Sequence, residues 1–217
     1  MIPRTIHYCW FGGRCKPSLV ERCIASWRKF CPDFELREWN ERNVNLRELP
    51  FAEAAYRHGK WSFVADQVEF RKVLDEGGVY FDTDVELLAP IDDLLEGEGF
   101  FACERDDPKL VAPGLGFAAP AGSAPIRAIV ERYDRMSFDP ACHMSQSSPM
   151  VVTDVLADFP EARCLPMRYF NPKGGCAGKV TLTDDTRAIH HYSASWFNWK
   201  QRAAYLWLPK VKRWFLR

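Results

Sequence analysis

The 217-residue sequence lacks several features that would assign it to a specialised class of protein. It has no run of 18 apolar residues, so we expect no membrane-spanning helix. Its eight cysteines form no C-x-x-C pair, so we expect no zinc site. Its first residues lack the basic stretch and apolar core of a secretory signal. We therefore expect a cytoplasmic protein with free thiols.

An excess of charge of either sign is also missing, because 29 lysines and arginines balance 29 aspartates and glutamates. A net charge of zero argues against nucleic-acid binding through the overall electrostatic field. The balance hides an uneven distribution. Residues 196–217 hold six cations, four tryptophans and no acid, which leaves 23 cations against 29 acids in residues 1–195. The tail thus carries a charge of +6 and the body −6.

Strand-like and helix-like segments alternate along the chain, with no internal repeat or low-complexity linker. We predict strands at 2–10, 34–39, 79–81 and 187–192, helices at 17–30, 62–76, 123–136 and 149–159, and a helical C-terminus. Such alternation favours one α/β domain with a largely parallel sheet, in which ligands bind at the carboxyl ends of the strands.

The apolar segment 79–81 delivers two carboxylates, Asp82 and Asp84, directly at its end and follows the turn-forming pair Gly77-Gly78. Two neighbouring acids repel each other unless a cation neutralises them. Oxygen ligands of this kind suit Mg²⁺ or Mn²⁺, which also bind substrate phosphates. The competing interpretation is a solvated acidic turn, because a bare Asp-x-Asp triplet is a weak motif.

Two further segments contain residues suited to a ligand site. His190 and His191 are adjacent and point to opposite sides of an extended strand, so at most one of them faces a given site. Trp10 ends the first predicted strand and offers a flat ring on which a base could stack. Taken alone, a histidine or tryptophan in such a position more often has a structural role.

Together and in this order, five motifs resemble glycosyltransferase family 32, which is related to the catalytic domains of large bacterial glucosylating toxins. The motifs are Ile6-His-Tyr-Cys-Trp-Phe-Gly-Gly13, Ser26-Trp27, Glu38-Trp-Asn40, Gly77-Gly-Val-Tyr-Phe-Asp-Thr-Asp-Val85 and His190-His-x-x-x-Ser-Trp196. The resemblance implies a GT-A fold, a Rossmann-like mixed, mostly parallel sheet flanked by helices. It also implies a nucleotide-sugar donor, Mn²⁺ or Mg²⁺ as cofactor, and retention of anomeric configuration. Residues 1–195 would form the catalytic domain, and residues 196–217 a helix or tail.

The resemblance also implies roles for individual residues. In donor binding, Trp10 would stack on the base, Asn40 would contact the nucleoside, Asp66 would bind hydroxyls of the transferred sugar, and Asp82 would bind ribose and sugar hydroxyls. Asp84 and His191 would ligate the metal. Ser195 and the Trp196 indole N–H would stabilise the leaving diphosphate, which makes Asp82, Asp84 and Trp196 the catalytic residues.

One position departs from the family pattern of Ser-Asp-x-x-Arg in the helix before the DXD sequence. Glu69 stands in place of the arginine, and Arg71 lies on a different helical face. An anion therefore replaces a cation where the diphosphate is expected, so donor recognition has changed or activity is lost. Ser148-Pro149 replaces a common Gly-Pro, which we expect to affect only the acceptor side.

The leading interpretation is a metal-dependent retaining glycosyltransferase of polysaccharide synthesis that acts on a saccharide or lipid-linked saccharide. UDP-sugars are favoured because Trp10 and Asn40 match UDP-using relatives, and GDP-sugars are the alternative donors. A catalytically weak nucleotide-sugar-binding protein is the competing interpretation. A purely structural adaptor at a membrane surface is the third.

The basic, aromatic tail is suited to an anionic membrane surface, so we expect the protein in the cytoplasm or on the cytoplasmic face of the membrane. Packing of the tail on the domain is the alternative. We predict that deletion of residues 210–217 weakens binding to anionic vesicles and leaves donor binding intact. Unchanged sedimentation of the truncated protein with such vesicles would exclude membrane attachment through these residues.

Overall fold

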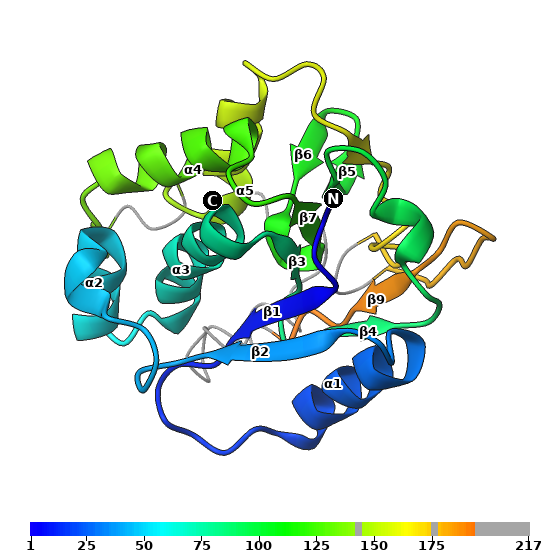
Figure 1. Ribbon diagram of the computed structural model, residues 1–217, viewed down its shortest axis with the longest axis horizontal. Coiled ribbons are helices and arrows are strands. Elements are labelled where there is room, and N and C mark those ends of the chain that lie inside the picture. The colour runs from blue at the N-terminus through cyan, green and yellow to red at the C-terminus, as the bar shows by residue number, and fades with distance from the viewer. Residues whose placement is uncertain (142–144, 175–177, 194–217) are drawn as a thin grey trace.

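A mixed sheet with helices on both faces forms the centre of the computed structural model, which describes residues 1–141, 145–174 and 178–193 (Figure 1). The strands are β1 (Thr5–Cys9), β2 (Glu35–Trp39), β3 (Gly78–Tyr80), β4 (Val85–Leu87), β5 (Phe100–Asp106), β6 (Lys109–Val111), β7 (Phe117–Ala119), β8 (Cys164–Leu165) and β9 (Ala188–His190). The α-helices are α1 (Ser18–Phe30), α2 (Pro50–Arg57), α3 (Trp61–Glu76), α4 (Ala124–Arg135) and α5 (Ser148–Leu156).

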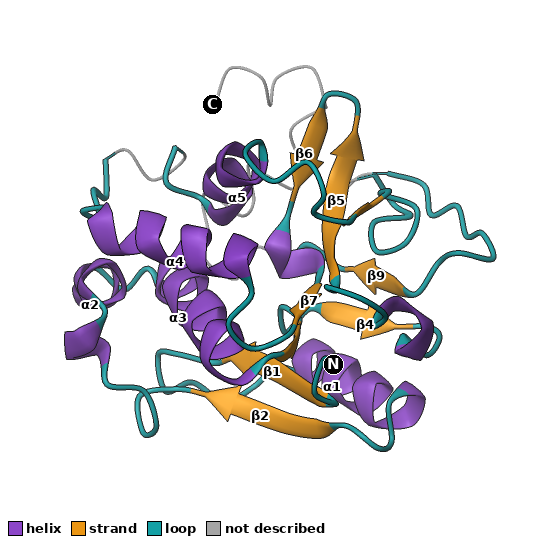
Figure 2. Cartoon of the chain, turned by 45° about the horizontal axis from the view of Figure 1, so that its top comes forward, coloured by secondary structure: helices purple, strands orange, loops and turns teal. Residues whose placement is uncertain are grey.

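The main sheet has the strand order β2-β1-β3-β7-β5-β6, and β8 pairs with β5. Parallel pairing joins β1 to β2, β1 to β3 and β5 to β8, whereas β7 is antiparallel to both β3 and β5. All strands of this sheet except β6 and β7 therefore run in one direction. The predicted mixed, mostly parallel α/β sheet is confirmed, and β4 and β9 form a separate antiparallel pair beside it (Figure 2).

Alternation along the strands divides the core between the two faces of the sheet. Ile6 and Tyr8 of β1 join α1 in one cluster, whereas Cys9 joins α2 to α5 in the other. In the same way Val79 and Phe81 face α1, and Tyr80 between them faces α3. Because side chains alternate, the next even position, Asp82, leaves β3 on the α3 side.

His7 joins β1, β2 and the turn between α3 and β3. Its Nδ1 accepts a hydrogen bond of 3.0 Å from the Trp39 indole N–H, and its Nε2 therefore carries the proton and donates to the Gly77 carbonyl at 2.9 Å. Burial lowers the pKa of His7, consistent with a neutral ring. Gly78 has φ of 117°, and a Cβ there would meet both Thr5 O and His7 Nε2. The predicted turn at Gly77-Gly78 thus requires glycine.

Most predicted elements lie close to the observed ones, with shifted ends. The helix predicted at 62–76 begins at Trp61, after an N-cap at Lys60 whose side chain makes no capping hydrogen bond. The sequence patterns did not predict helix α2 or the five strands β4 to β8. The predicted helical C-terminus lies outside the described residues. Among the residues that are described, no helix has both the length and the apolar character needed to cross a bilayer.

We predict that His7→Leu lowers the free energy of unfolding by about 3 kcal/mol, because the Trp39 N–H and the Gly77 carbonyl both lose their buried partner. Urea unfolding measures the change. The exposed His58 provides the matched control, since His58→Leu should change stability by no more than about 0.5 kcal/mol. A loss below about 1 kcal/mol for His7→Leu would contradict the assigned role.

Candidate active site at the carboxyl edge of the sheet

The carboxyl ends of three parallel strands bring the predicted site residues to one edge of the sheet. Trp10 follows β1, Asn40 follows β2, and Asp82 follows β3 closely. The Trp10 amide donates to the Trp39 carbonyl at 2.9 Å, which fixes the ends of β1 and β2 side by side. Since the strands are parallel, these ends meet at the edge where α/β proteins bind ligands.

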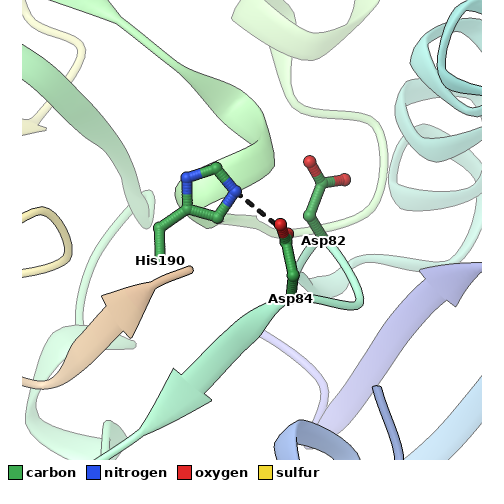
Figure 3. A group of neighbouring side chains, drawn as sticks. All are labelled: Asp82, Asp84 and His190. Carbon is green, nitrogen blue, oxygen red and sulfur yellow. Dashed lines mark hydrogen bonds and ion pairs between the residues drawn. The ribbon is translucent and has the colours of Figure 1, made fainter. Parts of the chain in front are cut away.

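Asp82, Asp84 and His190 form the one cluster among the described residues that could hold a metal ion, with ligand atoms within 4.8 Å of one another (Figure 3). His190 Nε2 lies 2.9 Å from Asp84 Oδ1, and the Ser193 amide donates to Asp84 Oδ2 at 2.7 Å. Asp84 is 8% exposed. Figure 3 shows His190 reaching toward Asp84 from β9, while both aspartates rise from the loop after β3.

The cluster contains His190, whereas the sequence comparison had assigned this position to His191. Pairing of β4 with β9 sets His190 opposite Val85, on one face of the pair, from which its Nε2 reaches Asp84, whereas the next residue points to the other face. His191 Nε2 instead lies 2.7 Å from Glu86 Oε2. Sequence alone indicated that at most one histidine faces the site, and the structure places His190 there.

Opposite charges dominate the electrostatics of Asp84 and His190. Burial opposes ionisation of Asp84, but the His190 imidazolium and the Ser193 N–H outweigh it and hold the pKa of Asp84 below its ordinary value. Burial likewise opposes protonation of His190, but the Asp84 carboxylate raises the pKa of its ring. In the metal-free protein these two groups form an ion pair.

Asp82 has a different environment from Asp84. Burial and, second, the Asp84 carboxylate raise the pKa of Asp82 to about 6. Its Oδ1 accepts a hydrogen bond of 3.0 Å from the Tyr80 hydroxyl, and its backbone N–H donates to the Gly114 carbonyl at 3.0 Å. A Cβ at Gly114 would collide with Asp82 Oδ2. Gly114 is thus a site residue that no sequence motif indicated, because it is distant in the chain.

Asp66 lies on α3 beside the first turn of α5. Its carboxylate accepts hydrogen bonds from the side chain and backbone of Ser148. Burial nevertheless raises the pKa of Asp66 to about 8, because these bonds only partly offset desolvation. Ser148 therefore contacts the residue assigned to the transferred sugar, whereas we had expected the Ser148-Pro149 difference to concern only the acceptor.

The side chains of Trp10 and Asn40, at the same edge of the sheet, make local hydrogen bonds. The Trp10 indole N–H donates to the Arg14 carbonyl at 2.7 Å, and Asn40 donates to Glu38 Oε1 at 3.1 Å. Arg71 points away from the site, as expected, and pairs with Asp134 of α4 at 2.8 Å. Ser195 and Trp196 lie outside the described residues.

We predict that Asp66 makes the metal-free protein less stable as the pH rises from about 5 to about 8. Its carboxyl stays protonated in the folded protein up to about pH 8 but ionises near 3.8 in the unfolded chain, so the unfolded state binds fewer protons across this range. Asp66→Asn should therefore lose less stability over this range, by about 1 kcal/mol or more. Urea unfolding in EDTA at both pH values measures the difference, and equal losses in the two proteins would refute it.

Comparison with known protein families identifies the segment of the chain that contains these aspartates. Residues 17–101 match the family model described as glycosyltransferase sugar-binding region containing DXD motif. This segment includes Asp66, Asp82 and Asp84. No curated protein matches the chain in sequence.

Several solved glycosyltransferase structures share the fold. The PaToxG glycosyltransferase superposes with a TM-score of 0.58 at 16% identity, over 74% of this chain and 70% of that one. A glycosyltransferase involved in glycosylation of the major capsid of PBCV-1 gives 0.52 at 12% identity, over 94% and 99%. Apo GlyE of Streptococcus pneumoniae TIGR4 gives 0.53 at 12% identity, over 100% of this chain and 64% of GlyE. The chain therefore has the GT-A glycosyltransferase fold and contains a segment that matches the DXD-type region, whose Asp82 and Asp84 lie at the carboxyl edge of the sheet.

Proposed function

We propose that the protein is a metal-dependent, retaining glycosyltransferase of the family 32 type. It transfers a sugar, as a hexosyltransferase, from a nucleotide donor to a saccharide or lipid-linked saccharide in polysaccharide synthesis. UDP-sugars are the favoured donors and GDP-sugars the alternative. The observation that carries the proposal is the Asp82, Asp84 and His190 cluster within the DXD-type region of a GT-A fold.

The donor set of the cluster fits a divalent cation. Two carboxylates and one imidazole suit Mn²⁺ well, and Mg²⁺ also binds through carboxylates. Asp84 and His190, with Asp82, would hold the ion in place of their present ion pair. When bound, such an ion neutralises negative charge on a diphosphate and stabilises it as a leaving group.

The chain's own side chains account for the remaining requirements of the reaction. Trp10 would stack on the base, and Asn40 would contact the nucleoside. Asp66 and Asp82 would accept hydrogen bonds from sugar and ribose hydroxyls and so orient the anomeric carbon. Ser195 and the Trp196 indole N–H would donate to the leaving diphosphate as its charge develops. In a retaining reaction the acceptor hydroxyl attacks from the face of the departing phosphate, which takes up its proton.

The proposal extends to the organisation of the chain. Residues 1–195 would form the catalytic domain, and the basic tail 196–217 would attach the enzyme to an anionic membrane surface in the cytoplasm. Such attachment would bring the active site close to a lipid-linked acceptor.

A second candidate is a nucleotide-sugar-binding protein with weak or no turnover. The observation that favours it is Glu69, which stands in α3 where the family pattern has arginine. This candidate keeps metal and donor binding but lacks transfer.

We predict that the protein hydrolyses a nucleotide-sugar in the presence of Mn²⁺ and that Asp84→Asn reduces this activity at least about 100-fold, because a metal ligand is lost. A panel of UDP- and GDP-sugars, screened first by thermal shift with Mn²⁺, supplies the donor for the assay. Asp75→Asn is the matched control, because Asp75 is an exposed carboxylate on α3, and it should leave turnover unchanged.

The two candidates give different outcomes in this assay. Turnover that depends on Asp84 supports the transferase. Mn²⁺-dependent donor binding without turnover across the panel supports the binding protein. Absence of both Mn²⁺ binding and donor binding would overturn the proposal altogether.

A further inference from the structure

The end of β9 and the residues that follow it surround one carboxylate, that of Asp84. His190 Nε2 lies 2.9 Å from Asp84 Oδ1. The His191 amide donates to the Asp84 carbonyl at 2.9 Å. The Ser193 amide donates to Asp84 Oδ2 at 2.7 Å. The segment 190–193 therefore contacts Asp84 at its backbone and at both oxygens of its side chain.

Tyr192 stands between these contacts and has an unusual backbone conformation. Its φ is 51°, and among the described residues it is the one non-glycine residue with a positive φ. The Cβ atom makes this left-handed conformation unfavourable, above all for a bulky side chain. Such a conformation persists where the surrounding contacts determine it, and it is enriched at functional sites.

The left-handed conformation decides where the Ser193 amide points. The hydrogen bond from His191 to the Asp84 carbonyl continues the antiparallel pairing of β4 with β9 by one residue. An extended residue at position 192 would carry the chain straight on by about 3.3 Å. The left-handed residue turns the chain instead, and the next amide meets Asp84 Oδ2.

The side chain of Tyr192 packs against the other member of the ion pair. The ring centroids of Tyr192 and His190 are 4.2 Å apart, with the ring planes at 57°. Aromatic packing of this kind is favourable and offsets part of the cost of the left-handed backbone. Tyr192 thus contacts His190 through its ring and acts on Asp84 through its backbone.

We propose that Tyr192 is a positioning residue whose left-handed backbone directs the Ser193 amide to Asp84 Oδ2 and leaves Asp84 Oδ1, beside His190, for the divalent cation. The inference rests on the proposed function and deepens it. Hydrogen bonds from neighbouring groups fix the orientation of metal-binding carboxylates. With one oxygen held by an amide, Asp84 would bind the ion through the other oxygen alone.

The test is the Mn²⁺ affinity of the full chain, measured by electron paramagnetic resonance titration. Tyr192→Val and Tyr192→Gly both remove the ring, but only glycine adopts a positive φ without strain. Apparent affinity falls with the fraction of the protein in the binding conformation. Tyr192→Val should therefore bind Mn²⁺ at least about fivefold more weakly than Tyr192→Gly, which corresponds to the cost of a left-handed residue.

A second pair of variants repeats the comparison without glycine. Tyr192→Asn should bind Mn²⁺ more tightly than Tyr192→Ala, because asparagine adopts the left-handed conformation more readily than alanine does. Tyr56 on α2 provides the matched control, since its backbone is helical. Tyr56→Val and Tyr56→Gly should bind Mn²⁺ within about twofold of each other.

A purely structural role for Tyr192 predicts one Mn²⁺ affinity for all variants that fold, as judged by circular dichroism. The inference is overturned if Tyr192→Val binds as tightly as Tyr192→Gly. If Tyr192→Val fails to fold, equal affinities of Tyr192→Ala and Tyr192→Asn overturn it. Absence of Mn²⁺ binding by the parent protein would overturn the proposed function, and the inference with it.

Discussion

Repulsion among carboxyl groups at the end of β3 is the constraint on which the site depends. Asp66, Glu69, Asp82 and Asp84 are close enough for their charges to affect one another's pKa. In the interior of a protein several such groups cannot all remain ionised without compensation. Each group therefore requires a cation, a hydrogen-bond donor or a proton, and the surrounding elements supply them.

The fold meets this requirement separately for each acid. The β4–β9 pair brings His190 and the Ser193 amide to Asp84. The N-terminal turn of α5 brings Ser148 to Asp66, and β3 itself brings Tyr80 to Asp82. Burial and the charges of Asp66 and Asp82 raise the pKa of Glu69 well above its ordinary value. Each of the two aspartates that form the cluster with His190 thus has a hydrogen-bond partner in place.

Local sequence signals predicted the elements that position the DXD residues. The apolar face of α1 and the glycine pair after α3 are read directly from residue spacing and backbone freedom. By contrast, β7 lies between β3 and β5 although it follows them in the chain, and its three residues carry no pattern that separates them from a loop. Strands this short are stabilised by their neighbours in the sheet, so their own sequence is weakly informative.

The sequence by itself determined that an apolar strand ends in two acids. It also determined that at most one of two adjacent histidines faces a given site, because side chains alternate along a strand. Only the tertiary structure decided that His190 is that histidine, since the register of β9 against β4 is a contact between distant segments. The same holds for the burial of Glu69. The sequence shows only that Glu69 differs from a family pattern, and the packing around α3 makes it a buried acid.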